Sequence, residues 1–145
     1  MKNIILRGPF LTSSGYGVHS RQIAKFFLEN YNNCNIKIEP TNWGMTSWKI
    51  NPEDENGLIQ QIMSKTGTQI NQKADISVQV QLPNEWDPNL ANVNIGITAG
   101  VETDVCNPSW IDNINKMDEV IVPSTHTKAC FENTQPIENI KTPIK

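Results

Sequence analysis

The sequence predicts one α/β domain of the Rossmann-like type, with helices on both faces of a largely parallel β-sheet. Short aliphatic runs recur along the chain and end at glycine, proline or other turn residues, which is typical of buried strands. Stretches with apolar residues at helical spacing separate most of these runs, and strands that alternate with helices form parallel sheets through crossover connections. The length of 145 residues is that of a single domain with one core.

The first forty residues predict a strand, a helix and a second strand. Residues 3–7 are aliphatic and stop at Gly8-Pro9, which breaks regular structure, so they predict a strand that leads into a loop. Residues 18–30 predict a helix, and residues 35–39 alternate as a short strand does. The apolar face of this helix comprises Ile23, Phe26, Phe27 and Tyr31. The side chains expected to contact solvent are those of Arg21, Gln22, Lys25 and Glu29.

No periodicity is visible between residues 40 and 54, where Trp43 and Trp48 lie among small polar residues. This segment predicts a functional loop or a flap folded over the domain. Residues 52–55 are a proline and three acids, which favour the start of a helix because its free amides and dipole attract negative charge. The residues expected on the buried face of that helix are Leu58, Ile59, Ile62 and Met63.

The second half of the chain predicts three more strands and two more helices. The strands are expected over residues 75–82, 93–98 and 119–122, and the helices over residues 108–117 and 124–133. Ser124 suits the N-cap of the last helix, and Trp110, Ile111 and Ile114 suit the buried face of the helix before it. The last dozen residues predict no regular element, and no domain boundary is predicted inside the chain.

Charge and hydropathy exclude several classes of partner. Twelve basic and 15 acidic residues give a net charge of −3, which provides no positive field for nucleic acid or an anionic membrane surface. No window approaches the roughly 20 apolar residues of a membrane span, and the N-terminus lacks the apolar run of a signal peptide. These features predict a soluble cytoplasmic protein.

The cysteines and histidines predict neither a metal site nor a disulfide. The cysteines are Cys34, Cys106 and Cys130, which form no CxxC pair, and the only histidines are His19 and His126. Three widely spaced cysteines favour free thiols in a reducing compartment.

Candidate site residues follow the predicted strands, because ligands of parallel sheets bind beyond the carboxyl ends of the strands. The loop over residues 8–17 has three glycines that allow close backbone approach, and it leads into a helix whose free amides suit an anionic or hydroxyl-rich group. Three further post-strand segments span residues 82–88, 99–104 and 123–128. Their carboxylates can hold a sugar hydroxyl, and Trp86, Trp43 or Trp48 could stack on a sugar. Each segment also has a structural interpretation: a connecting turn, a core tryptophan, or a helix cap with a solvated histidine.

A dinucleotide-binding fingerprint is an alternative for the first loop. Residues 15–20 read GxGxxS, and Glu39 ends the second predicted strand about 20 residues later, as in sites that bind NAD. In this alternative Gly15 and Gly17 would contact the pyrophosphate and Glu39 the ribose. Against it, Ser20 replaces the third glycine, and the glycines do not directly follow the strand.

Several motifs in order resemble the family 4 group of GT-B glycosyltransferases. The motifs are Gly8-Pro9-Phe10, Ser14-Gly15-Tyr16-Gly17, the run from Asn94 to Asp104, Trp110, and the run from Met117 to His126. The resemblance covers nearly the whole chain and is weakest over residues 40–73. It implies that residues 1–145 form the acceptor-side domain, half of a GT-B architecture, with no second domain present.

The resemblance also implies an activity and site residues. Members of the family transfer a sugar from a nucleotide-sugar to an acceptor hydroxyl, usually without a metal. By resemblance, Glu102, Asp104 and His126 are candidate catalytic residues. The substrate-binding candidates are Ser14, Gly15, Tyr16, Gly17, Thr103, Trp86 and Ser124. The best-known members have a histidine after the strand that ends here at Thr98, so the residue that polarises the acceptor is left open.

The resemblance leaves the catalytic state open. The family's second domain binds the nucleotide-sugar, and no residues here correspond to it, so we expect no cofactor and no turnover without a separate donor-binding domain. The expected partners are a sugar acceptor and either that domain or a second copy of the chain. The alternatives are a non-catalytic module that binds sugar or docks a partner, and the NAD-binding domain described above.

Overall fold

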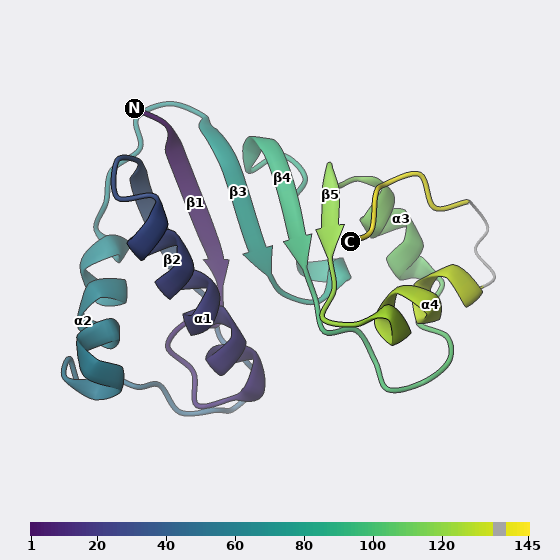
Figure 1. The fold of residues 1–145 in the computed structure, drawn as a ribbon, viewed down its shortest axis with the longest axis horizontal. Coiled ribbons are helices and arrows are strands. Elements are labelled where there is room, and N and C mark those ends of the chain that lie inside the picture. Colours follow the sequence, from purple (N-terminus) through teal and green to yellow (C-terminus); the bar gives the residue numbers. More distant parts are fainter. Residues whose placement is uncertain (135–138) are drawn as a thin grey trace.

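The computed structural model describes residues 1–134 and 139–145 and has the predicted α/β architecture (Figure 1). The strands are β1 (Asn3–Gly8), β2 (Asn35–Pro40), β3 (Ala74–Val80), β4 (Ala91–Ile97) and β5 (Glu119–Ile121). The helices are α1 (Gly15–Asn30), α2 (Asp54–Thr66), α3 (Ser109–Asn115), α4 (Thr125–Asn133) and a one-turn 3₁₀ helix, η1 (Pro83–Glu85). The five strands are all parallel, in the order β2-β1-β3-β4-β5.

The sheet is covered on both faces, as predicted. Alternate residues of each strand point to opposite sides, so each face presents side chains against which helices pack. One face packs against α1 and α2 in a core that includes Leu6, Ile38 and Val78. The other face carries Val120, which packs with residues of α3 and α4 and with Trp86 in a second core. Figure 1 shows α1 and α2 at the β2 side of the sheet and α3 and α4 at the β5 side.

The strand order places the loops after β1 and β3 at a topological switch point. From β1 the chain forms β2 on one side and then returns to form β3 on the other side of β1. In open parallel sheets, ligands bind at the carboxyl edge near such a reversal. The fold therefore directs attention to the edge where all the arrowheads of Figure 1 point.

The helix α1 buries only part of the predicted face: Ile23 and Phe27 pack against the core, whereas Tyr31 is 40% exposed. The buried residues of α1 are Gly17, Ser20, Arg21 and Ala24. The prediction that Arg21 contacts solvent is wrong, since only 1% of it is exposed, whereas Phe26 is 50% exposed. Arg21 can be buried because carbonyl oxygens and a carboxylate surround its guanidinium group, so its charge remains paired.

The helix α2 starts with a left-handed turn that the acidic start signal did not predict. Glu55, Asn56 and Gly57 have φ values of 53°, 57° and 81°. Asparagine and glycine tolerate this conformation, whereas Glu55 is held in it by an ion pair with Arg21. Leu58, Ile59 and Ile62 are buried as predicted, but Met63 is 39% exposed.

The C-terminal residues extend the sheet although no element was predicted there. Ile144 forms a parallel bridge with Val120, and the amide of Lys145 donates to the carbonyl of Val120 at 2.9 Å. The part of the prediction that concerns residues 135–138 lies outside the described residues. Within the described residues, none of the helices has the length and apolar character needed to cross a bilayer.

Candidate functional site

The site is built around the phenol of Tyr16, which joins the start of α1 to the end of β4. Its oxygen lies 3.1 Å from Thr98 Oγ1 and accepts a hydrogen bond from the amide of Ala99 at 3.0 Å. Tyr16 and Thr98 are 82 residues apart in the sequence, yet the parallel sheet brings the strand ends to one edge. The predicted convergence of the first and third candidate segments is therefore present.

The fourth candidate segment contacts the same stretch of chain. Ser124 caps α4 and accepts from the amide of Thr127 at 3.1 Å, as predicted. The hydroxyl of Thr127 donates to the carbonyl of Ala99 at 3.2 Å, and its Cγ2 lies only 2.6 Å from where a side chain on Gly100 would begin. Gly100 has φ of 72°, so both backbone and space require glycine here. Residues 98–100 are thus held between α1 and α4.

The glycines of the first loop have different environments. Ser14 caps α1 by accepting from the amide of Gly17 at 2.9 Å. A side chain on Gly17 would overlap the carbonyl oxygen of Thr12, so this glycine permits close packing of helix and loop. Gly15 has open space at the same position, with no atom within 4 Å, and is the glycine that a ligand can approach.

The segment between β2 and α2 is a flap, one of the two outcomes predicted for it. Trp43 stacks on Tyr16 with ring centroids 4.1 Å apart and an interplanar angle of 17°. Further along the flap, Ser13 N donates to the carbonyl of Ser47 at 2.9 Å, and Lys49 N donates to the carbonyl of Leu11 at 2.7 Å. The flap therefore closes over the β1–α1 loop and covers one side of the Tyr16 ring.

Arg21 ties the β1–α1 loop to the start of α2 from inside the fold. Its Nη1 donates to the carbonyls of Phe10 at 3.1 Å and Thr12 at 2.8 Å, and its Nε donates to Glu55 Oε1 at 2.7 Å. The side chain of Arg21 is 2% exposed and that of Glu55 is 32% exposed. Helical spacing could not predict this role, because the acceptors come from a loop and from a residue 34 positions away.

The candidate residues of the third segment are exposed beside this network. Glu102, Thr103 and Asp104 are all exposed, and Thr103 Oγ1 donates to the carbonyl of Val105 at 2.6 Å. His126 is exposed in the first turn of α4, next to Thr127. These side chains are free to meet a ligand at the edge where residues 98–100 lie.

Two buried cysteines, one of them in α4, lie close together. Cys106 and Cys130 are both buried, and Thr134 Oγ1 donates to the carbonyl of Cys130 at 2.8 Å and lies 3.2 Å from Cys106 Sγ. Burial raises the pKa of the Cys130 thiol, with further contributions from Cys106 and the charge of Asp104.

Trp86 has a structural role. It is 6% exposed, and its indole nitrogen donates to the carbonyl of Gln79 at 3.0 Å. A side chain on Gly96 would lie 2.6 Å from the indole, so Gly96 provides the space in which this ring packs on β4. In this structure the ring is part of the core and is not available to stack on a sugar.

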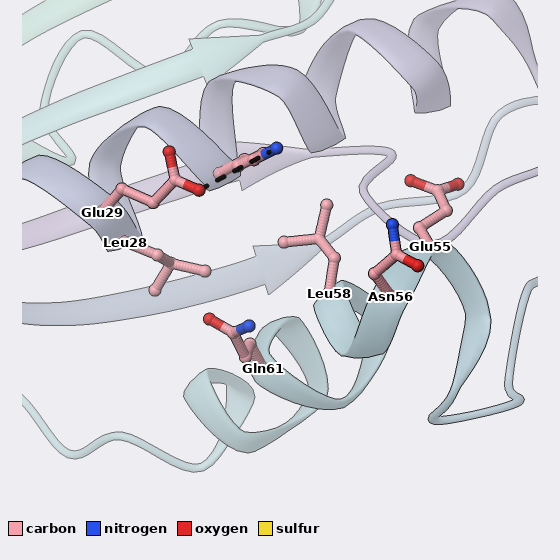
Figure 2. A pocket seen from close by; sticks show the side chains of 7 residues that line it. Leu28, Glu29, Glu55, Asn56, Leu58 and Gln61 are labelled. Carbon is pink, nitrogen blue, oxygen red and sulfur yellow. Dashed lines mark ion pairs between the residues drawn. The ribbon is translucent and has the colours of Figure 1, made fainter.

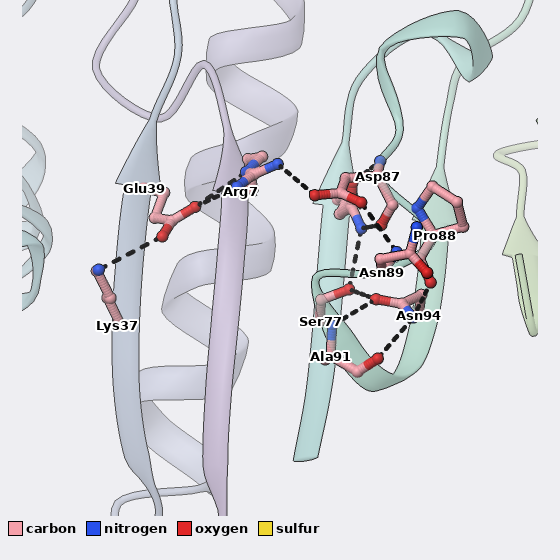
Figure 3. A network of polar contacts seen from close by, with 10 residues as sticks. Arg7, Lys37, Glu39, Ser77, Asp87, Pro88, Asn89, Ala91 and Asn94 are labelled. Atoms are coloured by element: carbon pink, nitrogen blue, oxygen red, sulfur yellow. Dashed lines mark hydrogen bonds and ion pairs between the residues drawn. The ribbon is translucent and has the colours of Figure 1, made fainter. Parts of the chain in front are cut away.

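Glu39, the residue that would hold the ribose in the NAD alternative, is part of a polar network on the sheet. Arg7 Nε and Nη2 donate to Glu39 Oε2 at 2.9 and 2.8 Å, and Lys37 lies 3.4 Å from the other carboxylate oxygen (Figure 3). Asp87 lies 3.8 Å from Arg7 on its other side. The Glu39 carboxylate is therefore already paired with two cations.

A separate pocket lies between α1 and α2 (Figure 2). It has a volume of about 210 Å³, and its lining includes Leu28, Leu58 and the ion pair of Lys25 with Glu29. None of the predicted site residues lines it. In residues 1–134 and 139–145, no three His, Cys, Asp or Glu side chains are grouped as a metal site requires.

Thr98 and Arg21 contribute to the site, but the sequence did not identify them as site residues, whereas Thr127 lies within the predicted segment 123–128. The place of Thr98, at the end of a predicted strand, was the available signal for it. Comparison with known proteins finds no matching family model, no matching curated protein and no matching solved structure. The functional interpretation therefore depends on the geometry of this edge and on the resemblance described above.

Proposed function

We propose that this chain is the acceptor-side domain of a glycosyltransferase with GT-B architecture. In this proposal the carboxyl edge of the sheet forms one wall of a carbohydrate-binding cleft. A second domain binds the nucleotide-sugar, and the sugar is transferred to an acceptor hydroxyl between the two domains. The reaction breaks the bond between the donor sugar and the phosphate and forms a glycosidic bond to the acceptor oxygen, whose proton passes to a base.

The observation that carries the proposal is the hydroxyl network around Tyr16. The hydroxyls of Tyr16, Thr98 and Thr127 all contact residues 98–100, at the end of β4. Uncharged hydroxyls and amides, arranged beside an aromatic ring, suit a polyol better than a phosphate or a metal ion. The exposed carboxylates of Glu102 and Asp104 and the imidazole of His126 are the candidate bases beside this network.

Trp43 supports a carbohydrate ligand by its position. Aromatic rings contact the apolar faces of sugars, and a ring already stacked on Tyr16 needs no further ordering when a ligand arrives. The net charge of −3 also favours a neutral acceptor over a polyanionic one.

The test is a titration of the isotope-labelled chain with methyl glycosides, followed by amide NMR spectra. We expect millimolar binding that shifts the amides of Tyr16 and residues 98–100. The variant Tyr16→Phe keeps the ring against Trp43 but loses the bonds to Thr98 and Ala99, so it should bind about tenfold more weakly. Unchanged spectra at these amides with every glycoside would contradict the proposal.

A second measurement tests whether the nucleotide-sugar site lies outside this chain. UDP and GDP are expected to cause no spectral change at micromolar concentration, and a nucleotide-sugar is expected not to be turned over by the chain alone. Micromolar nucleotide binding, or turnover, would show that the donor site lies in this chain.

A further inference from the structure

Gln81 follows β3 at the centre of the site edge and has an unusual hydrogen-bonding state. The residue is 7% exposed, and its Oε1 has no hydrogen-bond partner among the described residues. No other buried side-chain nitrogen or oxygen of the described chain is in this state. Leaving a buried amide oxygen without a donor destabilises a fold by about 1–3 kcal/mol, so such groups point to a ligand or a functional constraint.

The strand register places Gln81 beside the hydroxyl network. Val80 pairs with Ile97, so Gln81 and Thr98 are the next pair of positions along β3 and β4. The amide of Gln81 continues this pairing by donating to the carbonyl of Ile97 at 3.1 Å. Neighbouring strands are about 4.8 Å apart, so Gln81 and Thr98 are adjacent at this edge.

The hydroxyls of Tyr16 and Thr98 leave one hydrogen without an acceptor. The two oxygens share a single hydrogen bond, which uses the hydrogen of only one of them. Both oxygens also accept from backbone amides, Tyr16 from Ala99 and Thr98 from Gly100. The other hydroxyl hydrogen has no acceptor among the described residues. The edge therefore carries an acceptor without a donor, at Gln81, and a donor without an acceptor, at the Tyr16–Thr98 pair.

We propose that Gln81 and the Tyr16–Thr98 hydroxyl pair together bind one hydroxyl group of the ligand. A hydroxyl is both donor and acceptor, so it can donate to Gln81 Oε1 and accept from the free hydrogen of the pair. An ionised carboxylate or a phosphodiester has no hydrogen to give to Oε1, so the site favours an alcohol over these anions. This inference rests on the proposed function and adds the residue that holds a ligand hydroxyl.

Gln79 provides the matched control, since it is the same residue type two positions earlier, within β3, and both ends of its amide are hydrogen-bonded. Its Nε2 donates to Ser77 Oγ and to the carbonyl of Asp87, at 3.0 and 2.7 Å, and its Oε1 accepts from the amide of Asp87 at 2.7 Å. Methionine has nearly the shape of glutamine without its hydrogen-bonding groups. Gln79→Met should therefore lower the midpoint of urea unfolding, whereas Gln81→Met should leave it unchanged or raise it.

Binding provides the second readout. The methyl glycosides of glucose, galactose, mannose and N-acetylglucosamine are titrated, and the best of them is measured again with Gln81→Met. We expect its affinity to fall about tenfold, which corresponds to one lost hydrogen bond. One monodeoxy analogue of that glycoside should bind the original chain about tenfold more weakly than the parent glycoside does. Gln81→Met should bind this analogue and the parent glycoside equally well, because the missing hydroxyl is the one that Gln81 binds.

The outcomes separate this inference from the proposed function. If glycosides bind and Gln81→Met binds them equally well, the inference is wrong and the proposed function stands. If Gln81→Met lowers the unfolding midpoint as Gln79→Met does, Oε1 is satisfied within the folded protein and the inference is wrong. If no glycoside binds, both are wrong.

Discussion

Gly15 and Gly17 are two positions apart in the first turn of α1, yet their surroundings require different residues. Gly17→Ala would place a methyl group onto the carbonyl oxygen of Thr12 and 3.0 Å from Arg21 Nη1. Overpacking of this kind should lower the free energy of unfolding by about 3 kcal/mol. Gly15→Ala meets open space and should leave stability unchanged or raise it by up to about 1 kcal/mol. Urea denaturation of both variants checks this, and equal effects would contradict the packing role assigned to Gly17.

His19 is the residue expected to make stability depend on pH near neutrality. Partial burial in α1 lowers its pKa below the ordinary value of 6.5. The unfolded chain therefore binds a proton more readily than the folded chain, and stability falls as the pH drops below 6.5 toward the folded-state pKa. His19→Gln should flatten the dependence of the urea midpoint on pH between about 7 and 5. An unchanged slope would show that other groups cause the acid loss.

The residue-scale errors of the sequence analysis have one physical cause. Helical spacing identifies which side chains share a face, but not whether a charged member of that face finds partners inside the fold. Arg21 is buried because Phe10, Thr12 and Glu55 supply its acceptors, and all three come from other segments. Gln81 and Thr98 were likewise not identifiable as neighbours, since their adjacency depends on the register of β3 against β4.

At the scale of elements, the ion pair of Arg21 with Glu55 ties α1 to the left-handed turn of α2. Glu55→Gln leaves the buried guanidinium of Arg21 without its counter-charge. It also weakens the ion pair that holds residue 55 in its left-handed conformation, with φ of 53°. We expect a loss of about 2 kcal/mol, below the range for fully buried pairs because Glu55 is partly solvated.

Glu29→Gln is the control for this prediction. Glu29 is 61% exposed and lies 3.9 Å from Lys25 in the same helix, so its removal should cost about 0.5 kcal/mol or less. The two variants are compared by urea denaturation. Similar losses would mean that the Arg21 pair contributes no more than a surface pair does.

The flap depends on Trp43 more than on Trp48. Trp43→Leu removes the stacking on Tyr16, whereas Trp48 is 39% exposed and contributes its backbone to a bridge with Thr12. We expect Trp43→Leu to speed hydrogen exchange at the amides of Ser13 and Lys49 by about tenfold, while Trp48→Leu changes it little. Equal exchange in both variants would mean that the backbone bonds alone hold the flap.

Elements were predicted best where the local pattern is strong. The alternation before Leu82 and the cap at Ser124 identified β3 and α4, because both signals depend only on neighbouring residues. The left-handed turn at Asn56-Gly57 had a signal, since this dipeptide is typical of turns, but the acidic run before it favoured a regular helix start. The rule that ligands bind at parallel strand ends placed Tyr16 at the site. The stacking of Trp43 on Tyr16 could not be predicted, because the flap that carries Trp43 has no periodicity.

At the scale of the whole molecule, one sheet separates two cores. Ile59 and Ile62 lie in the core on the α1–α2 face, and Phe131 and Cys130 lie in the core on the opposite face. The two cores meet at β5, where Val120 lies in one core and Ile121 packs against the other, and β5 is paired with β4 in the same sheet. The chain should therefore unfold as one cooperative unit, as small single domains do.

Cysteine labelling tests this cooperativity across the sheet. Cys34 is partly exposed and should react with iodoacetamide in the folded protein, whereas Cys130 is 1% exposed and burial raises the pKa of its thiol, which lowers the fraction of reactive thiolate. Labelling of Cys130 then requires unfolding. Glu55→Gln changes only the opposite face, yet a loss of about 2 kcal/mol should raise the labelling rate of Cys130 about thirtyfold if the cores unfold together. A rate at Cys130 that stays the same, while the urea midpoint falls, would show that the two faces open independently.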